Sequence, residues 1–430
     1  MTDAELADLQ KSTFGYFLKE TNPANGMVPD STKEHAAASI AAIGFALTAY
    51  PVAVEREYLT RGEAIGRVLT TLRFFWNSPQ GTGPDAIGYQ GFYYHFLLMA
   101  TGQRAPDAEL STIDTAFLIA GALTAAQFFD RDTPEEQEIR TLADALYARV
   151  DWQWAQNGRL KVSHGWKPET GFIKHWWDGY TEALILYALG LGSPTHPLPA
   201  ASYAAWAESY RWTKLYDIEF LYAGPLFVHQ LSHVWIDFRG IQDEYMRGKG
   251  IDYFENSRRA AYVQQQYGIR NPKGFAGYGE YSWGITASDG PGPARRTVRG
   301  RPRTFYDYKA RAIPTGPDDG TLAPWAVVAS LPFAPELVLP TIKYFDEKFP
   351  EMTSEYGFKC SYNPTFSNGA SGASGASWIS QGYYGLDQGP IVMMIENYRS
   401  GLTWRLLRQC PYIRMGLRRA GFTGGWLTRE

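Results

Sequence analysis

The amino-acid sequence predicts an all-α protein, and three observations support this fold class. Apolar residues recur at helical spacing in about thirteen segments. Patterns that alternate like a strand are few and brief. No repeat of roughly 33–47 residues is visible, which argues against an open solenoid. We therefore expect helix pairs closed into a double ring, an (α/α)6 toroid with long active-site loops, formed by a single domain over residues 1–430.

Each expected helix rests on apolar spacing, and several also have recognisable starting residues. Thr60 is expected to cap one helix, and Thr133 followed by Pro134 to begin another, because threonine favours the cap and proline the first turn. A run of small apolar residues at 36–50 indicates a closely packed, buried helix. Helices are expected over 4–19, 36–50, 60–77, 112–129, 134–156, 179–191, 200–213, 222–236, 251–267, 322–331, 335–348, 389–400 and 402–419.

Long irregular stretches separate these helices, and loops of such length usually carry function. They cover 79–94, 157–178, 268–320 and 352–388. Within them, the basic Pro/Gly-rich segment 290–303 is expected to be mobile. The Gly/Ser/Ala tract 367–378 is expected to act as a lid. Short aromatic segments near 92–96 and 304–308 are candidates for a strand pair.

Charge and composition exclude several protein classes. The chain has 41 Lys plus Arg against 44 Asp plus Glu, a net charge of −3, without the basic surplus of a nucleic-acid binder. No window of about eighteen apolar residues predicts a membrane span. The N-terminal residues lack a signal-peptide pattern. The expected location is therefore cytoplasmic, or periplasmic if a signal peptide has been removed. Two cysteines leave the redox compartment and the oligomeric state open.

Aromatic residues are unusually abundant, at 15% of the chain, with 14 Trp against 8 Met. Flat rings stack on the C–H faces of sugars, so this surplus is typical of carbohydrate sites. A large aromatic core would give the same composition, and the two interpretations stay open at this point.

Two acids stand at the starts of very apolar helices, where a carboxyl group could take part in glycoside hydrolysis. Glu182 follows Trp176, Trp177 and Tyr180, and apolar neighbours raise the pKa of a carboxyl as a general acid requires. Asp114 begins the helix over 112–129 and could serve as the base. Either acid could instead be an ordinary first-turn residue that interacts with the helix dipole.

Other candidates are weaker. Asp289 follows Trp283 in a turn-forming Ser-Asp-Gly-Pro string, and Asp387 is expected near the start of a helix. His229 and His233 share a helix face at a spacing that can hold a metal, but a third ligand is not evident. The glycine-rich strings do not follow a strand, so a phosphate loop is not predicted.

Several strings together resemble one family, the bacterial glucoamylase-like family that includes the endo-β-1,2-glucanases. The likeness runs from about Phe14 to Phe422 in the family's order. It is carried chiefly by YTEALILYALGLGSPTHP, LFVHQLSHVWIDFRGIQDEY, YGEYSWGITASDGP and GLDQGPIVMMIENYRSGLTWRLLRQCPYI. The resemblance implies a six-hairpin toroid, hydrolysis of β-1,2-glucans to sophorose-type products, and no metal or organic cofactor.

Residue by residue, the resemblance implies that Glu182 is the general acid. Asp114 falls where typical endo-acting members have Glu in a Val-Glu-Thr string, and Ser111 replaces a further acid of the cleft. Asp30 matches a cleft-edge string whose usual arginine is Ser31 here. The altered acid cluster leaves the identity of the base and endo action open.

These observations predict a β-1,2-glucan hydrolase that acts by inversion on oligosaccharides or chain ends. Glu182 would protonate the leaving oxygen, Asp114 would activate water, and Asp289 is the second candidate base. The remaining candidates would contact substrate: Tyr93, Trp166 and Trp283 by stacking on or bordering glucosyl units, and Asp30, Glu109 and Asp387 through sugar hydroxyls. Three alternatives stay open, namely a glycosidase acting on another β-glucan, a transglycosylase acting on β-1,2-glucan, and a non-catalytic carbohydrate-binding protein.

Overall fold

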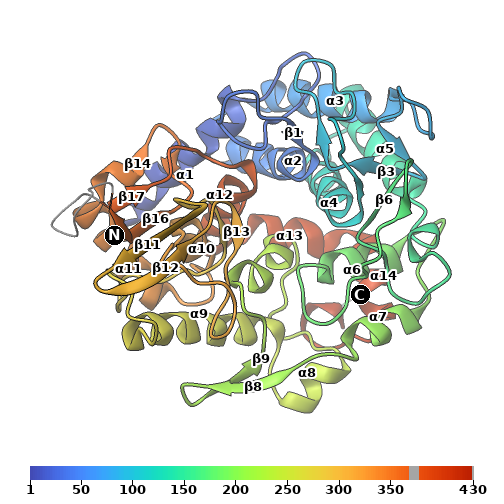
Figure 1. Ribbon diagram of the computed structural model, residues 1–430. Coiled ribbons are helices and arrows are strands. Elements are labelled where there is room, and N and C mark those ends of the chain that lie inside the picture. The colour runs from blue at the N-terminus through green and yellow to red at the C-terminus, as the bar shows by residue number, and fades with distance from the viewer. Residues whose placement is uncertain (368–376, 429–430) are drawn as a thin grey trace.

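The computed structural model describes residues 1–367 and 377–428, and it is rich in helices (Figure 1). The α-helices of these ranges are α1 (Asp3–Lys19), α2 (Ile40–Glu55), α3 (Arg61–Asn77), α4 (Thr112–Phe128), α5 (Pro134–Arg149), α6 (Leu184–Gly192), α7 (Ala200–Ala207), α8 (Glu244–Lys249), α9 (Tyr253–Arg270), α10 (Pro324–Ala329), α11 (Pro335–Lys348), α12 (Gly385–Arg399), α13 (Leu402–Gln409) and α14 (Pro411–Arg419).

The helices form a buried inner set and an amphipathic outer set. Nearly every residue of α2, α4, α6, α10 and α12 is buried. These inner helices pack on one another, α12 on α2, α2 on α4, and α4 on α6. The outer helices α1, α5, α11 and α14 cover them and expose one face to solvent, as their mixed sequences predict. Within the described ranges, every helix falls short of the length and apolar character that crossing a membrane requires.

Short strands lie in the segments that connect the helices. They are β1 (Ala38–Ser39), β2 (Gly88–Tyr89), β3 (Phe92–Tyr94), β4 (Phe96–Leu97), β5 (Leu110–Ser111), β6 (Gly165–Lys167), β7 (Gly171–Phe172), β8 (Trp212–Leu215), β9 (Ile218–Leu221), β10 (Ala287–Ser288), β11 (Ala294–Val298), β12 (Arg301–Phe305), β13 (Lys309–Ala310), β14 (Thr353–Ser354), β15 (Gly357–Phe358), β16 (Tyr362–Ser367) and β17 (Ser377–Ile379).

A five-stranded antiparallel sheet, in the order β2-β3-β5-β6-β7, positions the start of α4. Ser111 of β5 lies opposite Tyr93 of β3 and Gly165 of β6, and β5 then continues directly into α4. Ser111 is therefore both the end of a strand and the N-cap of a helix. The sheet fixes where the first turn of α4, which contains Asp114, lies.

Most expected helices are present, and the differences have local causes. The expected helix over 402–419 is divided at Pro411, which lacks the N–H that a continuous helix needs. The segment 222–236 forms two 3₁₀ turns, η2 (Leu226–His229) and η3 (Leu231–Val234), instead of an α-helix. Its backbone bonds elsewhere, since the Leu226 N–H donates to the Ile285 carbonyl.

One expectation for the loops is wrong. The segments near 92–96 and 304–308 do not pair, because β3 bonds to β2 and β5 while β12 bonds to β11. The segment 290–303 contains most of the β11–β12 hairpin, whose two strands are held by a continuous antiparallel register. Residues 368–376 of the expected lid lie outside the described residues.

The backbones of α2 and α4 meet in direct contact at a pair of glycines. A Cβ added to Gly121 would lie 2.1 Å from the Gly44 carbonyl oxygen, and one added to Gly44 would lie 2.3 Å from the Phe117 carbonyl oxygen. No side chain fits at such a distance from backbone atoms. The aromatic rings of Phe45 and Phe117 stack against Trp235 beside this crossing.

The substitution Gly121→Ala is therefore expected to destabilise the protein by roughly 1–3 kcal/mol, because the added methyl group forces α2 and α4 apart. Chemical denaturation of both proteins measures the change. Gly66→Ala in α3 is the matched control, since nothing lies within 4 Å of its added Cβ. The control should gain about 0.5–1 kcal/mol from helix propensity. Equal stability of Gly121→Ala and wild type would contradict the close contact.

Candidate active site

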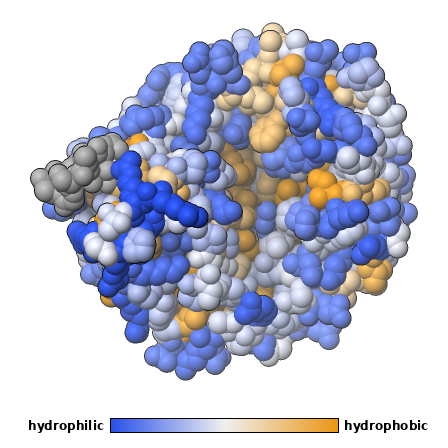
Figure 2. Space-filling view, in the orientation of Figure 1, coloured by the Kyte–Doolittle hydropathy of each residue, from blue (hydrophilic) through white to orange (hydrophobic). Residues whose placement is uncertain are grey.

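A cavity of about 350 Å³ opens where the first turns of α4, α10 and α12 approach η2 and η3. Figure 2 shows this hollow near the middle of the face, with apolar residues on its floor. Its size suits a small-molecule site, for which a few polar groups in an apolar wall are typical. The residues that line it are His95, Glu109, Ser111, Ile113, Asp114, Phe117, His164, Ile173, Trp177, Glu182, Phe227, Leu231, Ala287, Tyr308, Trp325 and Leu386.

Glu182 projects into the cavity from the residues just before α6. Its main-chain carbonyl accepts a hydrogen bond from Ser232 Oγ at 2.9 Å, and the same Oγ accepts from the Ile185 N–H at 3.1 Å. Burial raises the pKa of Glu182 to about 7, and the charge of nearby Asp114 adds to this effect. A backbone hydrogen bond lowers the pKa but does not offset the burial. A substantial fraction of this carboxyl therefore keeps its proton at neutral pH.

Asp114 lies in the same cavity, in the first turn of α4. Ser111 Oγ donates to its Oδ2 at 2.5 Å and accepts from its N–H at 3.3 Å. The side chain of Asp114 is only 11% exposed, so water reaches it chiefly from the cavity. This arrangement holds the carboxylate in one orientation at the end of the helix.

His95 joins Asp114 to Glu109, and the sequence did not reveal it as a site residue. Its Nδ1 lies 2.8 Å from Glu109 Oε1, and its Nε2 lies 3.6 Å from Asp114 Oδ2. Burial alone would lower the pKa of His95, but the carboxylates of Asp114, Glu109 and Asp30 outweigh it and raise the value to about 9. A cationic imidazolium therefore lies between two carboxylates at neutral pH.

An aromatic wall faces these polar groups. The rings of His164 and Trp177 stack with centroids 3.9 Å apart and planes 21° from parallel. Trp177 Nε1 donates to Thr112 Oγ1 at 3.0 Å, which ties the wall to α4. The sequence identified Trp177 only as an apolar neighbour of Glu182 and missed His164. Both rings come from the segment 157–178, which sequence analysis treated as a long irregular loop.

Two predicted stacking residues lie in the interior, so these predictions are wrong. Tyr93 is fully buried against Phe75, and its hydroxyl donates to the Phe75 carbonyl at 3.3 Å. Trp283 is 1% exposed, and its indole N–H donates to Thr341 Oγ1 at 3.1 Å. The third residue, Trp166, is partly buried among aromatic rings of the sheet region and lies outside the cavity lining.

The remaining predicted acids form a second group beside the cavity lining. Asp289 accepts hydrogen bonds from Lys33 Nζ at 3.2 Å and Ser380 Oγ at 2.9 Å. Burial raises the pKa of Asp387 well above its usual value, and the charges of Asp30 and Asp289 add to this effect. Burial also raises the pKa of Asp30, as does Asp114, while His95 and Lys33 lower it. The group is electrostatically coupled to the cavity although none of its carboxyls lines it.

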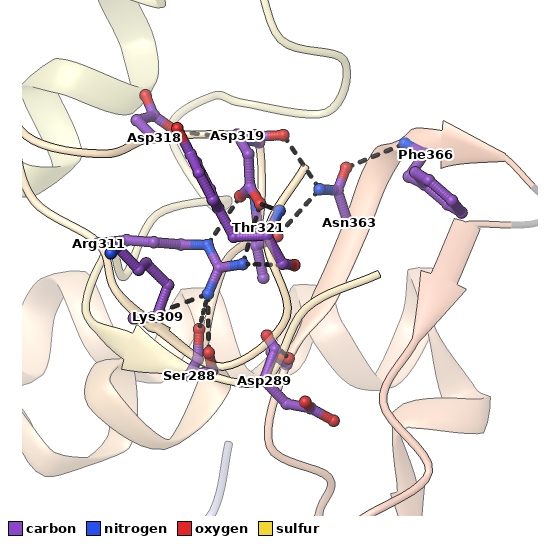
Figure 3. A network of polar contacts seen from close by, with 12 residues as sticks. Ser288, Asp289, Lys309, Arg311, Asp318, Asp319, Thr321, Asn363 and Phe366 are labelled. Carbon is purple, nitrogen blue, oxygen red and sulfur yellow. Dashed lines mark hydrogen bonds and ion pairs between the residues drawn. The ribbon is translucent and has the colours of Figure 1, made fainter. Parts of the chain in front are cut away.

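A buried guanidinium fixes the loops that form this side of the cavity (Figure 3). Arg311 and Asp319 form a fully buried ion pair, with the Arg311 Nε 2.7 Å from the Asp319 Oδ1. Arg311 also donates to the Ser288 carbonyl at 2.7 Å and to the Asp307 carbonyl at 3.2 Å. It therefore ties β10 to the residues just before Tyr308, which lines the cavity. In Figure 3 the Asp289 side chain points away from this guanidinium.

The histidine pair has packing roles. His229 Nε2 lies 3.3 Å from the Ala223 carbonyl oxygen, and His233 Nε2 lies 3.0 Å from Ser257 Oγ. Burial lowers the pKa of His229 to about 4 and that of His233 to about 3, so both rings are neutral. Across residues 1–367 and 377–428, no group of three or more His, Cys, Asp or Glu side chains is arranged to hold a metal ion.

Comparison with known proteins places the chain in a family. The glycoamylase family model, described as "Putative glucoamylase", matches residues 174–411. The chain therefore belongs to this family. It is 33% identical to a "putative glucoamylase" of Bacteroides uniformis ATCC 8492, whose crystal structure superposes with a TM-score of 0.87 and which covers 100% of this chain and 99% of that one.

Two further relatives have more specific names. The endo-beta-1,2-glucanase of Chitinophaga pinensis, solved with sophorotriose and glucose, is 28% identical, with a TM-score of 0.86 over 99% of this chain and 100% of that one. An exo beta-1,2-glucooligosaccharide sophorohydrolase (non-reducing end) of Parabacteroides distasonis is 28% identical over 97% of this chain. The present chain spans 58% of that relative's length.

The charge on His95 should make the free energy of unfolding depend on pH. Its raised pKa means that the folded protein binds a proton more tightly than the unfolded chain, so this contribution is complete below about pH 6.5 and lost as the pH rises through about 9. His95→Gln should lose roughly 1–3 kcal/mol at pH 6 and clearly less at pH 10. Thermal unfolding at both pH values measures it.

The control for this experiment is His35→Asn, which changes an exposed histidine with a positive φ of 61° that asparagine tolerates. Its difference from wild type should be small at both pH values. A loss in His95→Gln that does not depend on pH would contradict a charged His95.

Proposed function

We propose that the protein is an inverting glycoside hydrolase that acts on β-1,2-glucan oligosaccharides and releases sophorose. The observation that carries this proposal is the pair of carboxyls in one cavity: Glu182, whose pKa is raised to about 7, and Asp114, held by Ser111 and His95. Glycosidases need one protonated and one ionised carboxyl on either side of the bond. The names of the Parabacteroides and Chitinophaga relatives support the glucan substrate.

We also infer that the helices close into an (α/α)6 toroid and that residues 1–430 act as one domain. The sequence of contacts among buried helices supports this arrangement, since α10 packs on α12, α12 on α2, α2 on α4, and α4 on α6. A single cluster of buried apolar residues extends from Leu6 to Leu427. In such a ring, the helix starts and their loops would surround the substrate at one end.

In the proposed reaction, Glu182 donates its proton to the leaving glycosidic oxygen as the bond to the anomeric carbon breaks. A water molecule attacks that carbon from the opposite face and passes a proton to Asp114. The product sugar then has the inverted configuration. Desolvation keeps Glu182 protonated until the leaving oxygen needs the proton, as general acid catalysis requires.

Asp114 is preferred to Asp289 as the base because of what each carboxylate contacts. Asp289 is held by the Lys33 ammonium and the Ser380 hydroxyl and does not line the cavity. Asp114 opens to the cavity. The Trp177–His164 wall is the surface that a glucosyl ring would stack on, in place of the buried Tyr93 and Trp283.

We propose that two of the remaining acids, Glu109 and Asp30, form hydrogen bonds with hydroxyl groups of the substrate. Glu109 lines the cavity, and burial, which would raise its pKa, is outweighed by His95, so it stays ionised at neutral pH. Glu109 would accept a hydrogen bond from such a hydroxyl. Asp30 is partly exposed and would meet a hydroxyl of a glucosyl unit further along the cleft, whereas Asp387 is 1% exposed, lies outside the cavity lining and would not reach the substrate.

Glu182→Gln should lower kcat by about 10²–10⁴-fold while glucan binding persists, because the amide keeps the shape of the side chain but has no proton to donate. Single-turnover hydrolysis and calorimetric binding of sophorose-type oligosaccharides measure the two effects. Glu169→Gln is the matched control, since this exposed glutamate pairs with Arg104 outside the cavity. Activity of Glu182→Gln within tenfold of wild type would remove Glu182 from the acid role.

The pH dependence follows from the same group. Because the acid must be protonated, kcat/KM should fall as the pH rises through about 7, the pKa of Glu182, and should decline about tenfold for each further pH unit. The profile of kcat/KM between pH 5 and pH 9 tests this. A profile that stays flat up to pH 9 would show that the proton comes from another group.

If the enzyme attacks chain ends, the size of its first products should differ from that of an enzyme that cleaves within the chain. Ser111 replaces an acid of the endo-acting cleft, so we expect few productive positions for the middle of a long chain. Sophorose should dominate from the first minutes on polymeric β-1,2-glucan, with a slow fall in viscosity. A rapid fall in viscosity with oligosaccharides of mixed length would show internal cleavage instead.

A further inference from the structure

A second hollow lies at the β11–β12 hairpin, apart from the proposed active site. Its volume is about 220 Å³, and arginines supply three of its lining residues while no carboxylate is among them. The residues that line it are Gly274, Ala276, Val298, Arg299, Arg301, Arg303 and Thr365. In Figure 2 the most hydrophilic part of this face lies over the hairpin, to the left of the central hollow.

The hairpin concentrates positive charge on a chain whose net charge is −3. Residues 294–303 contain five arginines and no acid. Arg299 occupies the two-residue turn, and Arg301 and Arg303 follow it on β12. Within the described ranges, no ion pair joins Arg299, Arg301 or Arg303 to a carboxylate, and no carboxylate lines the hollow.

The hollow is built from fixed groups. Arg303 lies over the Phe275 ring at 4.3 Å, and its Nη2 donates to the Lys273 carbonyl at 2.7 Å. Its Nε is buried and has no hydrogen-bond partner among the described residues. Gly274 has a φ of +66°, and a Cβ there would lie 2.9 Å from Arg301 Nη1, so glycine lets this guanidinium lie against the backbone.

We propose that this hollow binds a phosphate-type oxyanion carried as a substituent on the saccharide substrate. A phosphoryl group offers three oxygens and more than one negative charge, which suits several guanidiniums better than a single carboxylate does. Tyr308 of the cavity follows Arg303 by five residues, a span of at most about 18 Å. A sugar chain that leaves the cavity on the side of the hairpin would bring a substituent to the arginines.

The assignment of the oxyanion to the glucan rests on the proposed function, whereas the oxyanion site itself does not. The full-length protein is titrated with inorganic phosphate by calorimetry at low ionic strength, because salt screens such contacts. The double variant Arg299→Gln/Arg301→Gln should lose about tenfold or more in phosphate affinity, since two charge-assisted contacts disappear. Both side chains are exposed, so the variant is expected to fold.

Arg295→Gln is the matched control, because Arg295 is exposed on the same hairpin but does not line the hollow. Its phosphate affinity should stay within about twofold of wild type. An equal loss in Arg295→Gln, or no phosphate binding by wild type at millimolar concentration, would overturn the proposal.

A kinetic comparison then identifies the source of the anion. β-1,2-Glucan oligosaccharides with phosphoryl substituents should have a lower KM than unsubstituted ones, and the double variant should remove this difference. Phosphate binding without any difference in KM would overturn the proposal that the oxyanion is a substituent on the sugar. The hollow would then be a site for a free oxyanion. If neither oligosaccharide is hydrolysed, the proposed function fails while the phosphate titration still decides on the site.

Discussion

The contact between α2 and α4 is the constraint on which the candidate active site depends. Glycines at 44 and 121 let two helix backbones meet without intervening side chains. Asp114 lies seven residues before Gly121 on the same helix, about 10 Å along its axis. The sheet that contains β5 holds the other end, because Ser111 is both a paired strand residue and the helix cap. A helix fixed at both places gives Asp114 one position relative to the Glu182 carboxyl.

The two carboxyls of the cavity, Glu182 and Asp114, have different surroundings. Burial is the main cause that raises the pKa of Glu182 to about 7. Asp114 instead contacts the His95 imidazolium and the Ser111 hydroxyl. One cavity thus presents a carboxyl that keeps its proton and a second carboxyl held beside a cation, an arrangement that acid–base chemistry on a glycosidic bond can use. Arg311 contributes at a distance by tying β10 to the residues just before Tyr308, which lines the cavity.

The sequence predicted well what depends on local pattern. The helical spacing of apolar residues located most helices. Glu182 and Asp114 were found because each is an acid at the start of a very apolar helix. It could not separate buried aromatics from exposed ones, and so Tyr93 and Trp283 were assigned to the substrate although their polar atoms bond within the interior. His95 and His164 were missed because strand pairing in the loops, which brings them to the cavity, leaves little periodic signal. The segment 222–236 has the apolar spacing of a helix but forms two 3₁₀ turns, because its backbone makes hydrogen bonds to other parts of the chain.

The central claim is that Glu182 keeps its proton near neutral pH, and infrared difference spectroscopy tests it most directly. Protonated carboxyls absorb apart from carboxylates, and subtracting the Glu182→Gln spectrum isolates this one group. The account predicts a protonated carboxyl at pH 6 that disappears with a midpoint near the pKa of about 7. A Glu182 carboxylate already ionised at pH 5.5 would contradict the account.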